Sequence, residues 1–308
     1  MSAKELAVKE HFLSVLLEND AKSPALACIE TLLECVKKTK ATTLTELNNE
    51  LKLAISVIQN TDFSYMSVSS AGELFLRFIS LAVLDNPDQN FSECQKVLWH
   101  RGQQFLRKIS ASAEKIALLS QSFMRGETKI LIHGQNSIIL MSLIMAAKKN
   151  QRCEVYLTDS EPKKDLELFV KQLRAEGINC TVILFAAVGY IMEKMDMVFV
   201  GAEGVVENGG IVNKIGTLTV AICAKAKNKP LYVLTESIKF YRVYPLNQSD
   251  MPVQFKYFAS VLKDETKDIS REHPLNDYTP PEYISLLFTD LGILTPAAVS
   301  DELIKLYL

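Results

Sequence analysis

The chain has 308 residues, of which 48% are hydrophobic and 23% are charged, and its formal net charge is −2. This is the composition of an ordinary globular protein, and the length favours two domains. Because the charges are nearly balanced, the chain lacks the broad basic field with which proteins bind nucleic acid or a membrane surface. We therefore expect no direct contact with nucleic acid and no membrane partner.

The N-terminus and the cysteines indicate a protein of the cytosol. The first residues, MSAKELAVKEHF, contain no signal-peptide core, and the longest apolar run, residues 138–147, is too short to span a bilayer. The six cysteines show no CxxC spacing, and the four histidines lie far apart. We therefore expect reduced thiols, no metal site and no bound cofactor.

The first 125 residues or so show the periodicity and the capping signals of helices only. Ser23-Pro24 has the pattern of an N-cap followed by proline at the first helical position. Thr43 with Glu46, and Ser70 with Glu73, have the spacing of capping boxes, in which the two residues close the first turn of a helix. These signals predict an all-helical N-terminal domain.

The helical series ends with segments predicted near residues 90–108 and 112–125, the second finishing at Gly126 as a C-terminal cap. From Lys129 onward, short apolar strands alternate with helices. The predicted strands are Ile130–His133, Glu154–Thr158, Thr181–Phe185, Met197–Val200, Leu231–Thr235 and Ile284–Phe288. The predicted helices are Ile138–Lys149, Pro162–Glu176, Leu218–Lys227 and a last one after Thr295-Pro296.

Alternation of this kind is typical of a doubly wound, mostly parallel, Rossmann-like sheet. We therefore predict an α/β protein with a helical domain over residues 1–126, followed by a sheet domain over residues 127–308 that also carries a dimerisation surface. The proline-containing stretch 245–282 is predicted to be irregular.

Residues Gly201–Thr217, which read GAEGVVENGGIVNKIGT, form the most informative stretch. They follow the strand Met197–Val200 and run into a helix, and their glycines permit tight turns and close backbone approach. In an open parallel sheet, ligands collect beyond the carboxyl ends of the strands. The other predicted ends are His133-Gly134, Thr158-Asp159, Phe185 and Thr235-Glu236. A strand end, a glycine-rich loop and a helix start at one place predict an anion or ligand site.

The signatures of common nucleotide enzymes and of hydrolases do not occur. After the first strand, residues 133–137 (HGQNS) contain one glycine where a dinucleotide-binding turn needs three. Neither a Walker A lysine motif nor a GxSxG elbow is present. The sequence therefore favours neither a dehydrogenase, nor a nucleotide hydrolase, nor a serine hydrolase.

Four stretches resemble one family, the regulatory subunits of eukaryotic translation initiation factor 2B and their isomerase relatives. They are Gly201–Thr217, Ser69–Phe78 (SSAGELFLRF), Ala186–Lys194 (AAVGYIMEK) and the ending from Leu287 to Leu306. The resemblance covers nearly the whole chain. Because the chain begins almost directly with a helix, the resemblance favours the alpha type over the beta and delta types, which tend to carry longer N-terminal extensions.

The relatives that are enzymes, ribose-1,5-bisphosphate isomerase and methylthioribose-1-phosphate isomerase, move a proton between neighbouring sugar carbons with a cysteine and an aspartate. The resemblance places Gly134 at the cysteine and Glu203 at the aspartate, and it leaves no arginine for substrate phosphate near Ser69–Gly72. A glycine has no proton to transfer, and the longer glutamate changes the placement of the carboxylate. We therefore expect no isomerase activity. An aldose–ketose isomerase that uses His133 and Glu203 is the alternative, and a hydrogen-bonded pocket or core histidine is the simpler interpretation of His133.

The remaining pocket positions of the family are kept. They are Asn208, Gly209, Asn213, Lys214, Gly216 and Thr217. Together with His133, Gly134 and Glu203, they suggest binding without catalysis, with a sugar phosphate or nucleotide monophosphate held by Lys214 and the N-terminus of the following helix. The alternative is that this loop only packs and caps a helix.

The resemblance also implies partners. It implies a homodimer that joins the beta, gamma, delta and epsilon subunits of the guanine nucleotide exchange factor for initiation factor 2, with the exchange chemistry in epsilon. It further implies that the helical half helps to sense initiation factor 2 phosphorylated on its alpha subunit. For the dimer interface, the apolar residues around Val212 and Tyr241 are the candidates, and ordinary core strands are the alternative.

Overall fold

The computed structural model describes residues 2–17, 23–61, 65–84, 91–159, 163–251 and 274–307. The chain divides into two compact units, Met1–Ala111 with Ile304–Leu308, and Ser112–Leu303. The structure places the boundary between the units at Ala111 and Ser112, one helix before residue 126, where we predicted it. Helix α6 (Ser112–Gln121) groups with the sheet because its Ile116 is buried in the same apolar cluster as strand residues Ile130 and Phe199.

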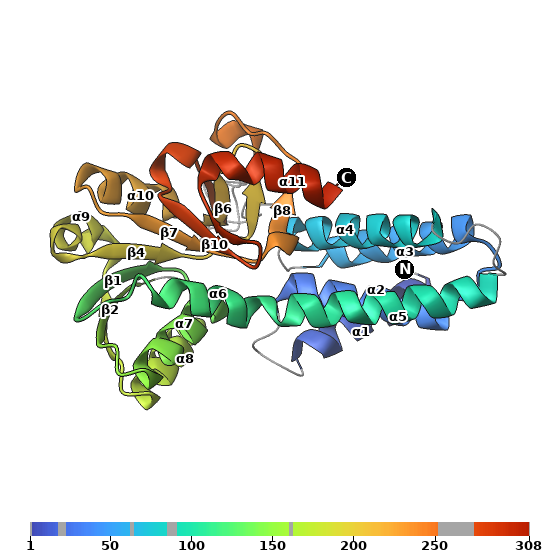
Figure 1. The fold of residues 1–308 in the computed structure, drawn as a ribbon, viewed down its shortest axis with the longest axis horizontal. Helices are drawn as coiled ribbons and strands as arrows, with labels where there is room; N and C mark the ends of the chain where they lie inside the picture. The colour runs from blue at the N-terminus through green and yellow to red at the C-terminus, as the bar shows by residue number, and fades with distance from the viewer. Residues whose placement is uncertain are drawn as a thin grey trace, which may run out of the picture. The chain divides into compact units, whose positions relative to one another are not determined.

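The first unit is built from helices (Figure 1). They are α1 (Ala3–Leu17), α2 (Pro24–Lys38), α3 (Leu44–Gln59), α4 (Tyr65–Leu84) and α5 (Phe91–Ser110). The stripe predicted on α3 is buried at Leu47, Leu51, Ile55 and Ile58, as expected for residues that return to one face every three or four positions. Burial of these stripes gives the unit its own core.

Two of the three predicted helix N-caps are confirmed. The Ser23 hydroxyl accepts a hydrogen bond from the Leu26 N–H, and the Thr43 hydroxyl accepts one from the Glu46 N–H at 3.2 Å. The prediction at Ser70 is wrong, because α4 begins at Tyr65 and Ser70 is fully buried inside it. Serines in a helix interior commonly bond to the preceding turn, as neighbouring Ser69 does to the Tyr65 carbonyl.

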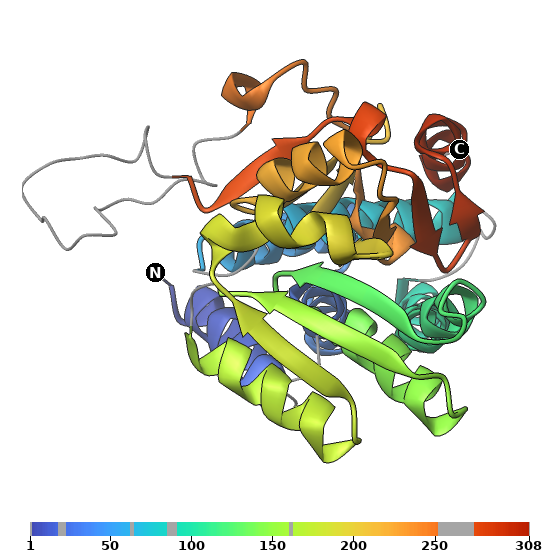
Figure 2. The same cartoon turned by 90° about the vertical axis from the view of Figure 1, so that its left-hand side faces the viewer.

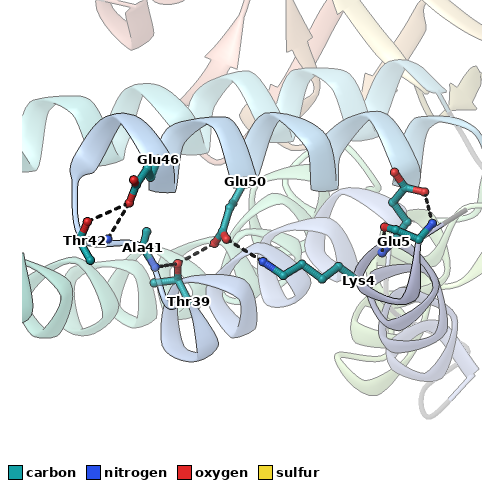
Figure 3. Close-up of polar contacts among 8 residues, drawn as sticks. Lys4, Glu5, Thr39, Ala41, Thr42, Glu46 and Glu50 are labelled. Carbon is teal, nitrogen blue, oxygen red and sulfur yellow. Dashed lines mark hydrogen bonds and ion pairs between the residues drawn. The ribbon is translucent and has the colours of Figure 1, made fainter.

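Polar contacts fix the junction between α2 and α3 (Figure 3). The carboxylate of Glu50 accepts hydrogen bonds from Thr39 Oγ1 at 2.6 Å and Lys4 Nζ at 3.2 Å. The Thr39 hydroxyl also accepts the Ala41 N–H, and Glu46 accepts the Thr42 N–H. The hydrogen bond from Thr39 is the main reason that the pKa of Glu50 is lowered. These bonds hold the α2–α3 turn against the start of α1.

The second unit contains a seven-stranded sheet. Its strands are β1 (Thr128–His133), β2 (Cys153–Thr158), β3 (Asn179–Ile183), β4 (Met197–Val200), β7 (Leu231–Leu234), β10 (Leu286–Thr289) and β11 (Gly292–Leu294). They lie in the order β11-β10-β7-β4-β1-β2-β3, and all neighbours are parallel except β10 and β11. The predicted doubly wound, mostly parallel sheet is therefore confirmed.

Helices cover both faces of this sheet. The remaining helices are α7 (Ser137–Lys148), α8 (Lys163–Ala175), α9 (Val188–Ile191), α10 (Thr217–Ala226) and α11 (Val299–Tyr307). Figures 1 and 2 show α7 and α8 on one face and α10 on the other. Helix α6 ends at Gln121, and Gly126, which we predicted to cap it, lies in a left-handed turn before β1 with φ of +70°.

A second, four-stranded sheet lies in the same unit. Its strands β8 (Phe240–Tyr241), β5 (Gly204–Val206), β6 (Ile211–Lys214) and β9 (Asn276–Thr279) follow each other in this spatial order. The stretch that we interpreted as a glycine-rich loop is therefore a β5–β6 hairpin, and part of the stretch predicted to be irregular is strand β9. The rest of that stretch includes residues 252–273, with Pro252, and these residues lie outside the described ones.

Candidate functional site

The strand order of the large sheet reverses between β1 and β4. In such sheets the crevice beyond the carboxyl ends of these two strands is where ligands bind. His133, the last residue of β1, pairs with Val200, the last residue of β4. Beyond these two residues the chain continues at Gly134 and at Gly201. The position that the sequence predicted from strand alternation is thus the switch point of the sheet.

Five of the predicted residues, from the end of β1 and from the hairpin, come together beyond these strand ends, in the region that we call the crevice. A Cβ atom at Gly134 would lie 3.4 Å from Lys214 Cδ, and one at Gly216 would lie 3.1 Å from His133 Cε1. Glu203 joins the start of the hairpin, where its N–H donates to the Val212 carbonyl at 2.8 Å. His133, Gly134, Glu203, Lys214 and Gly216 therefore gather around one end of β5 and β6.

Asn208 lies at the opposite end of the hairpin. Its side-chain amide donates to the Pro245 carbonyl and to the Tyr278 hydroxyl, and its Oδ1 accepts the Gly210 N–H at 2.9 Å. It also lines a separate cavity of about 450 Å³, together with Glu207 and Tyr278. Asn208 and the adjacent Gly209 form the hairpin turn between β5 and β6, away from the other predicted pocket residues.

His133 is buried, and both of its ring nitrogens are in hydrogen-bonding contact. Nδ1 lies 2.8 Å from Thr158 Oγ1, and Nε2 lies 3.0 Å from the Ile215 carbonyl oxygen. A carbonyl can only accept, so Nε2 carries the proton and Nδ1 accepts from the threonine hydroxyl. Desolvation by burial lowers the pKa of His133. The ring is therefore neutral, and its basic nitrogen is already used inside the fold.

Lys214, the last residue of β6, supplies a cation at the end of the hairpin that lies near His133 and Gly134. Its Nζ donates to the Gln135 side-chain oxygen at 2.9 Å, which links the end of β6 to the loop between β1 and α7. The N-terminus of α7 is capped within that loop by Asn136, whose side chain accepts the N–H groups of Ile138 and Ile139. Asn136 thus occupies two of the N–H groups at the start of α7, and Lys214 adds a cation beside this loop.

The start of α10 is occupied by a residue that the sequence did not point to. Asp277 Oδ2 accepts the N–H groups of Gly216 at 2.8 Å and of Leu218 at 3.1 Å. Burial raises the pKa of Asp277 to about 6, although these hydrogen bonds act to lower it. We predicted that a ligand phosphate would use this helix N-terminus. The carboxylate of Asp277 holds the amide groups that such a phosphate would need.

Asn213 and Thr217 hold the junction between β6 and α10 together. Asn213 Nδ2 donates to Thr217 Oγ1 at 3.0 Å, and this hydroxyl donates to the Lys214 carbonyl at 2.6 Å. Both side chains are buried. Their contacts lie inside the fold, where they fix the backbone that carries Lys214.

A buried ion pair lies beside the crevice, and the sequence pointed only to its Glu236, at the end of a predicted strand. Lys239 and Glu236 are 7% and 8% exposed, and their Nζ and Oε2 atoms are 3.1 Å apart. Lys239 Nζ also donates to the Ala202 carbonyl at 3.2 Å, next to Glu203. No local sequence motif predicts that these two residues form a buried pair.

The two candidate interface residues differ in exposure. Val212 is 1% exposed within the chain itself, because it lies in the central strand pair of the small sheet. Tyr241, in the edge strand β8, is only partly buried. Among the described residues, no cluster of three metal-ligating side chains occurs. None of the helices in these residues has the length and apolar character needed to cross a bilayer.

The fold and its crevice define a Rossmann-like α/β protein with an added helical unit. The model of the initiation factor 2 subunit family matches residues 18–296. A similar relative is the translation initiation factor eIF2B subunit alpha of Caenorhabditis elegans, which is 42% identical over 95% of this chain and 96% of the relative. The chain therefore belongs to the initiation factor 2 subunit family.

More distant comparisons agree with this assignment. The ribose 1,5-bisphosphate isomerase of Archaeoglobus fulgidus is 27% identical over 87% of this chain and 82% of the enzyme. Among solved structures, the tetrameric eIF2B-beta2-delta2 complex from Chaetomium thermophilum gives a TM-score of 0.79 at 18% identity, over 99% of this chain and 96% of the matched one. That structural likeness establishes the fold.

Proposed function

We propose that this chain is a regulatory, non-catalytic subunit of the guanine nucleotide exchange factor for initiation factor 2, of the alpha type. Its identity of 42% to a subunit alpha, over almost the full length of both chains, carries the proposal. In this role it forms a homodimer in the cytosol that bridges assemblies of the beta, gamma, delta and epsilon subunits. Its helical unit contributes to sensing phosphorylated initiation factor 2 alpha, and the exchange reaction belongs to another chain.

Native mass spectrometry tests this role. The purified chain should have the mass of a homodimer, and the tagged chain recovered from cells should carry the four other subunits. A matched measurement adds purified initiation factor 2, phosphorylated or not on its alpha subunit, to the recovered assembly. A chain recovered from cells without any of these partners would contradict the proposal.

An isomerase is the second candidate, because an isomerase is 27% identical to this chain. Two observations count against it. Gly134 stands where the resemblance places the catalytic cysteine, and the basic nitrogen of His133 accepts a hydrogen bond from Thr158 within the fold. A general base needs a free lone pair within reach of substrate. Turnover of ribose 1,5-bisphosphate by the purified chain, lost in Glu203→Gln, would reverse our preference.

For the crevice we propose binding of a sugar phosphate or nucleotide monophosphate without turnover. Lys214 would contact the phosphate, beside Gly134, whose missing side chain leaves room near the lysine stem. Because Asp277 holds the first amides of α10, the phosphate would depend on the lysine rather than on that helix. Ribose 5-phosphate should raise the melting temperature of the wild type and not that of Lys214→Ala. Lys225→Ala, on the exposed side of α10, is the matched control.

For the homodimer we propose that the surface around Tyr241 contributes to the interface. Val212 is unsuited to test this, because a charge at a residue that is 1% exposed would disrupt the small sheet itself. Tyr241→Glu should convert the dimer to monomers while its circular dichroism stays that of the wild type. An unchanged dimer mass would remove Tyr241 from the interface.

A further inference from the structure

A cavity of about 290 Å³ lies within the helical unit, and no part of the function proposed above uses it. Helices α1, α2 and α3 form its walls. Most of its lining is apolar, and it includes Val8 of α1, Cys35 of α2, and Leu53, Ala54 and Val57 of α3. Sites for small molecules commonly have volumes of about 300–1,000 Å³. The cavity lies near the lower end of that range, which suits a small molecule rather than a protein segment.

The carboxylate of Glu50 lies at one end of the cavity, between the three walls (Figure 3). It accepts hydrogen bonds from Lys4 of α1 at 3.2 Å and from Thr39, directly after α2, at 2.6 Å. All three residues line the cavity. The hydrogen bond from Thr39 is the largest of the effects that lower the pKa of Glu50, so this group is an anion at neutral pH. The Lys4 side chain is 80% exposed, and ion pairs of this exposed kind contribute little to stability. Another cation can therefore take the place of Lys4.

His11 and Thr31 line the other end of the cavity. The Thr31 hydroxyl donates to the Ala27 carbonyl at 2.9 Å, so it accepts from His11 Nδ1 at 3.2 Å. His11 follows Lys4 by seven residues on α1, which is about 10 Å along a helix. The cavity thus has an exchangeable ion pair at one end and an uncharged hydroxyl, already hydrogen-bonded, at the other. Its length suits a ligand with one charged group and a body the size of a single aromatic ring.

The charges around the cavity favour a cationic ligand. The side chains of Glu34 and Glu50 are 28% and 35% exposed, whereas that of Lys38, which pairs with Glu34, is 71% exposed. The thiol of Cys35 reports on the balance of these charges inside the cavity. Burial and the two carboxylates raise the pKa of Cys35 to about 11, and Lys38 alone opposes them. The carboxylates therefore act on the interior more strongly than the lysines, which extend into solvent.

We propose that this cavity binds a small primary amine with an apolar body, whose ammonium group replaces that of Lys4 at the Glu50 carboxylate. The apolar body packs against Val8, Leu53 and Val57, and the bound amine joins α1 to α3. This inference does not depend on the proposed function, because every residue that it names belongs to the helical unit.

Three probes of similar shape test the proposal on the full chain. They are 2-phenylethylamine, 2-phenylethanol and phenylacetate, which carry a cation, a neutral hydroxyl and an anion. Titration of the methyl resonances of Val8, Leu53 and Val57, followed by NMR, gives each affinity. We expect the amine to bind at least tenfold more tightly than the alcohol, and phenylacetate to bind most weakly. Equal affinities, tighter binding of phenylacetate, or no response to the amine at millimolar concentration would each overturn the proposal.

Charge variants identify the group that binds the ammonium. Glu50→Gln should weaken binding of the amine at least fivefold and leave that of the alcohol unchanged. Glu46→Gln is the matched control, because Glu46 lies one turn earlier on α3 and bonds to Thr42 outside the cavity. Lys4→Gln should tighten binding of the amine at least twofold, since it removes the competing cation. A cavity that recognises only the apolar ring would respond to neither change, and that result would contradict the proposal.

A further variant guards against misfolding of Glu50→Gln. Ala7 lines the cavity from an exposed position on α1, so a larger side chain there fills the cavity without entering the core. Ala7→Trp should abolish binding of the amine while its circular dichroism stays that of the wild type. Unchanged affinity in this variant would place the amine elsewhere on the chain and overturn the proposal.

Discussion

The carboxylate of Asp277 lies 2.8 Å from the main-chain nitrogen of Gly216, and it binds the first turn of α10 from a strand of the small sheet. Strand β9, which carries Asp277, pairs with β6 so that Asp277 lies opposite Asn213. A negative charge at a helix N-terminus is favourable. The chain thus supplies its own anion at a place where α/β proteins commonly bind one.

Asp277 should give the stability a distinct pH dependence. Its pKa is about 6 in the folded chain, against an ordinary value of 3.8, so the folded state binds a proton more tightly than the unfolded state. Its stabilising contribution is full below about pH 4 and is lost as the pH rises through about 6. Relative to Asp277→Asn, the free energy of unfolding of the wild type should fall by about 1 kcal/mol between about pH 5 and about pH 7. Urea unfolding of both chains, compared across this range, measures it; parallel curves would contradict the prediction.

His133 should act in the opposite direction. Burial lowers its pKa from the ordinary value of 6.5, so the unfolded state takes up a proton first as the pH falls. The contribution of His133 is present above about pH 6.5 and is lost as the pH falls through its folded pKa. His133→Gln should lack this loss, and at neutral pH it should also be destabilised by about 1–3 kcal/mol, because buried partners lose their hydrogen bonds. Urea unfolding of both chains across a range of pH checks this prediction. A His133→Gln variant whose free energy of unfolding falls with pH below about 6.5 as much as that of the wild type would refute it.

Gly216 should not tolerate a side chain. It has φ of +102°, and a Cβ atom there would lie 2.6 Å from Phe185 Cε2. Gly216→Ala should therefore lower the free energy of unfolding by about 3 kcal/mol, the sum of a left-handed backbone and a steric clash. Gly126→Ala is the control, because Gly126 also has positive φ but nothing lies within 4 Å of the added atom. It should lose about 1 kcal/mol. Equal losses would mean that the clash at Gly216 is relieved without cost.

The cap of α3 should be measurable in the helical unit. Thr43→Ala removes the hydroxyl that accepts the Glu46 N–H, and loss of such a cap costs about 1 kcal/mol. Thr43→Ser keeps an oxygen in place and should stay within about 0.5 kcal/mol of the wild type. Thermal unfolding of the three chains under one set of conditions compares them. A serine variant as weak as the alanine variant would show that the hydroxyl is not the stabilising group.

Six strands of the large sheet could be predicted because each is a short apolar run between turn residues, and the edge strand β11 (Gly292–Leu294) was not predicted. Strand β4, for example, has the predicted bounds Met197–Val200. The hairpin was missed because its glycines were interpreted as a loop. The Asn208-Gly209 pair between two apolar runs is in fact a hairpin signal, and Gly209 has φ of +84°.

Two residues of the site could not be predicted from local pattern. The hydrogen bond from Gly216 to Asp277 joins residues 61 positions apart, and the one from Lys239 to Ala202 joins residues 37 positions apart. Such pairs are set by how the strands come together, which no spacing rule within one element describes. The fold class, the position of the crevice and the charged residues Lys214 and Glu203 were therefore accessible from the sequence, and the buried charges of Asp277 and Lys239 were not.

The cap that Asp277 provides also sets an order of events during folding. Helix α10 follows β6 directly. The first amides of α10 and the outer edge of β6 gain their hydrogen-bond partners only when β9 pairs with β6, and Asp277 of β9 lies 61 positions after Gly216. Closing a loop of that length costs chain entropy before the contacts repay it, and it slows folding. A chain emerging during synthesis will have made the whole β4–α10 segment before its crevice can close. Strand β9 is thus the piece that completes the site, and any truncation ahead of Asn276 leaves the crevice without its internal anion.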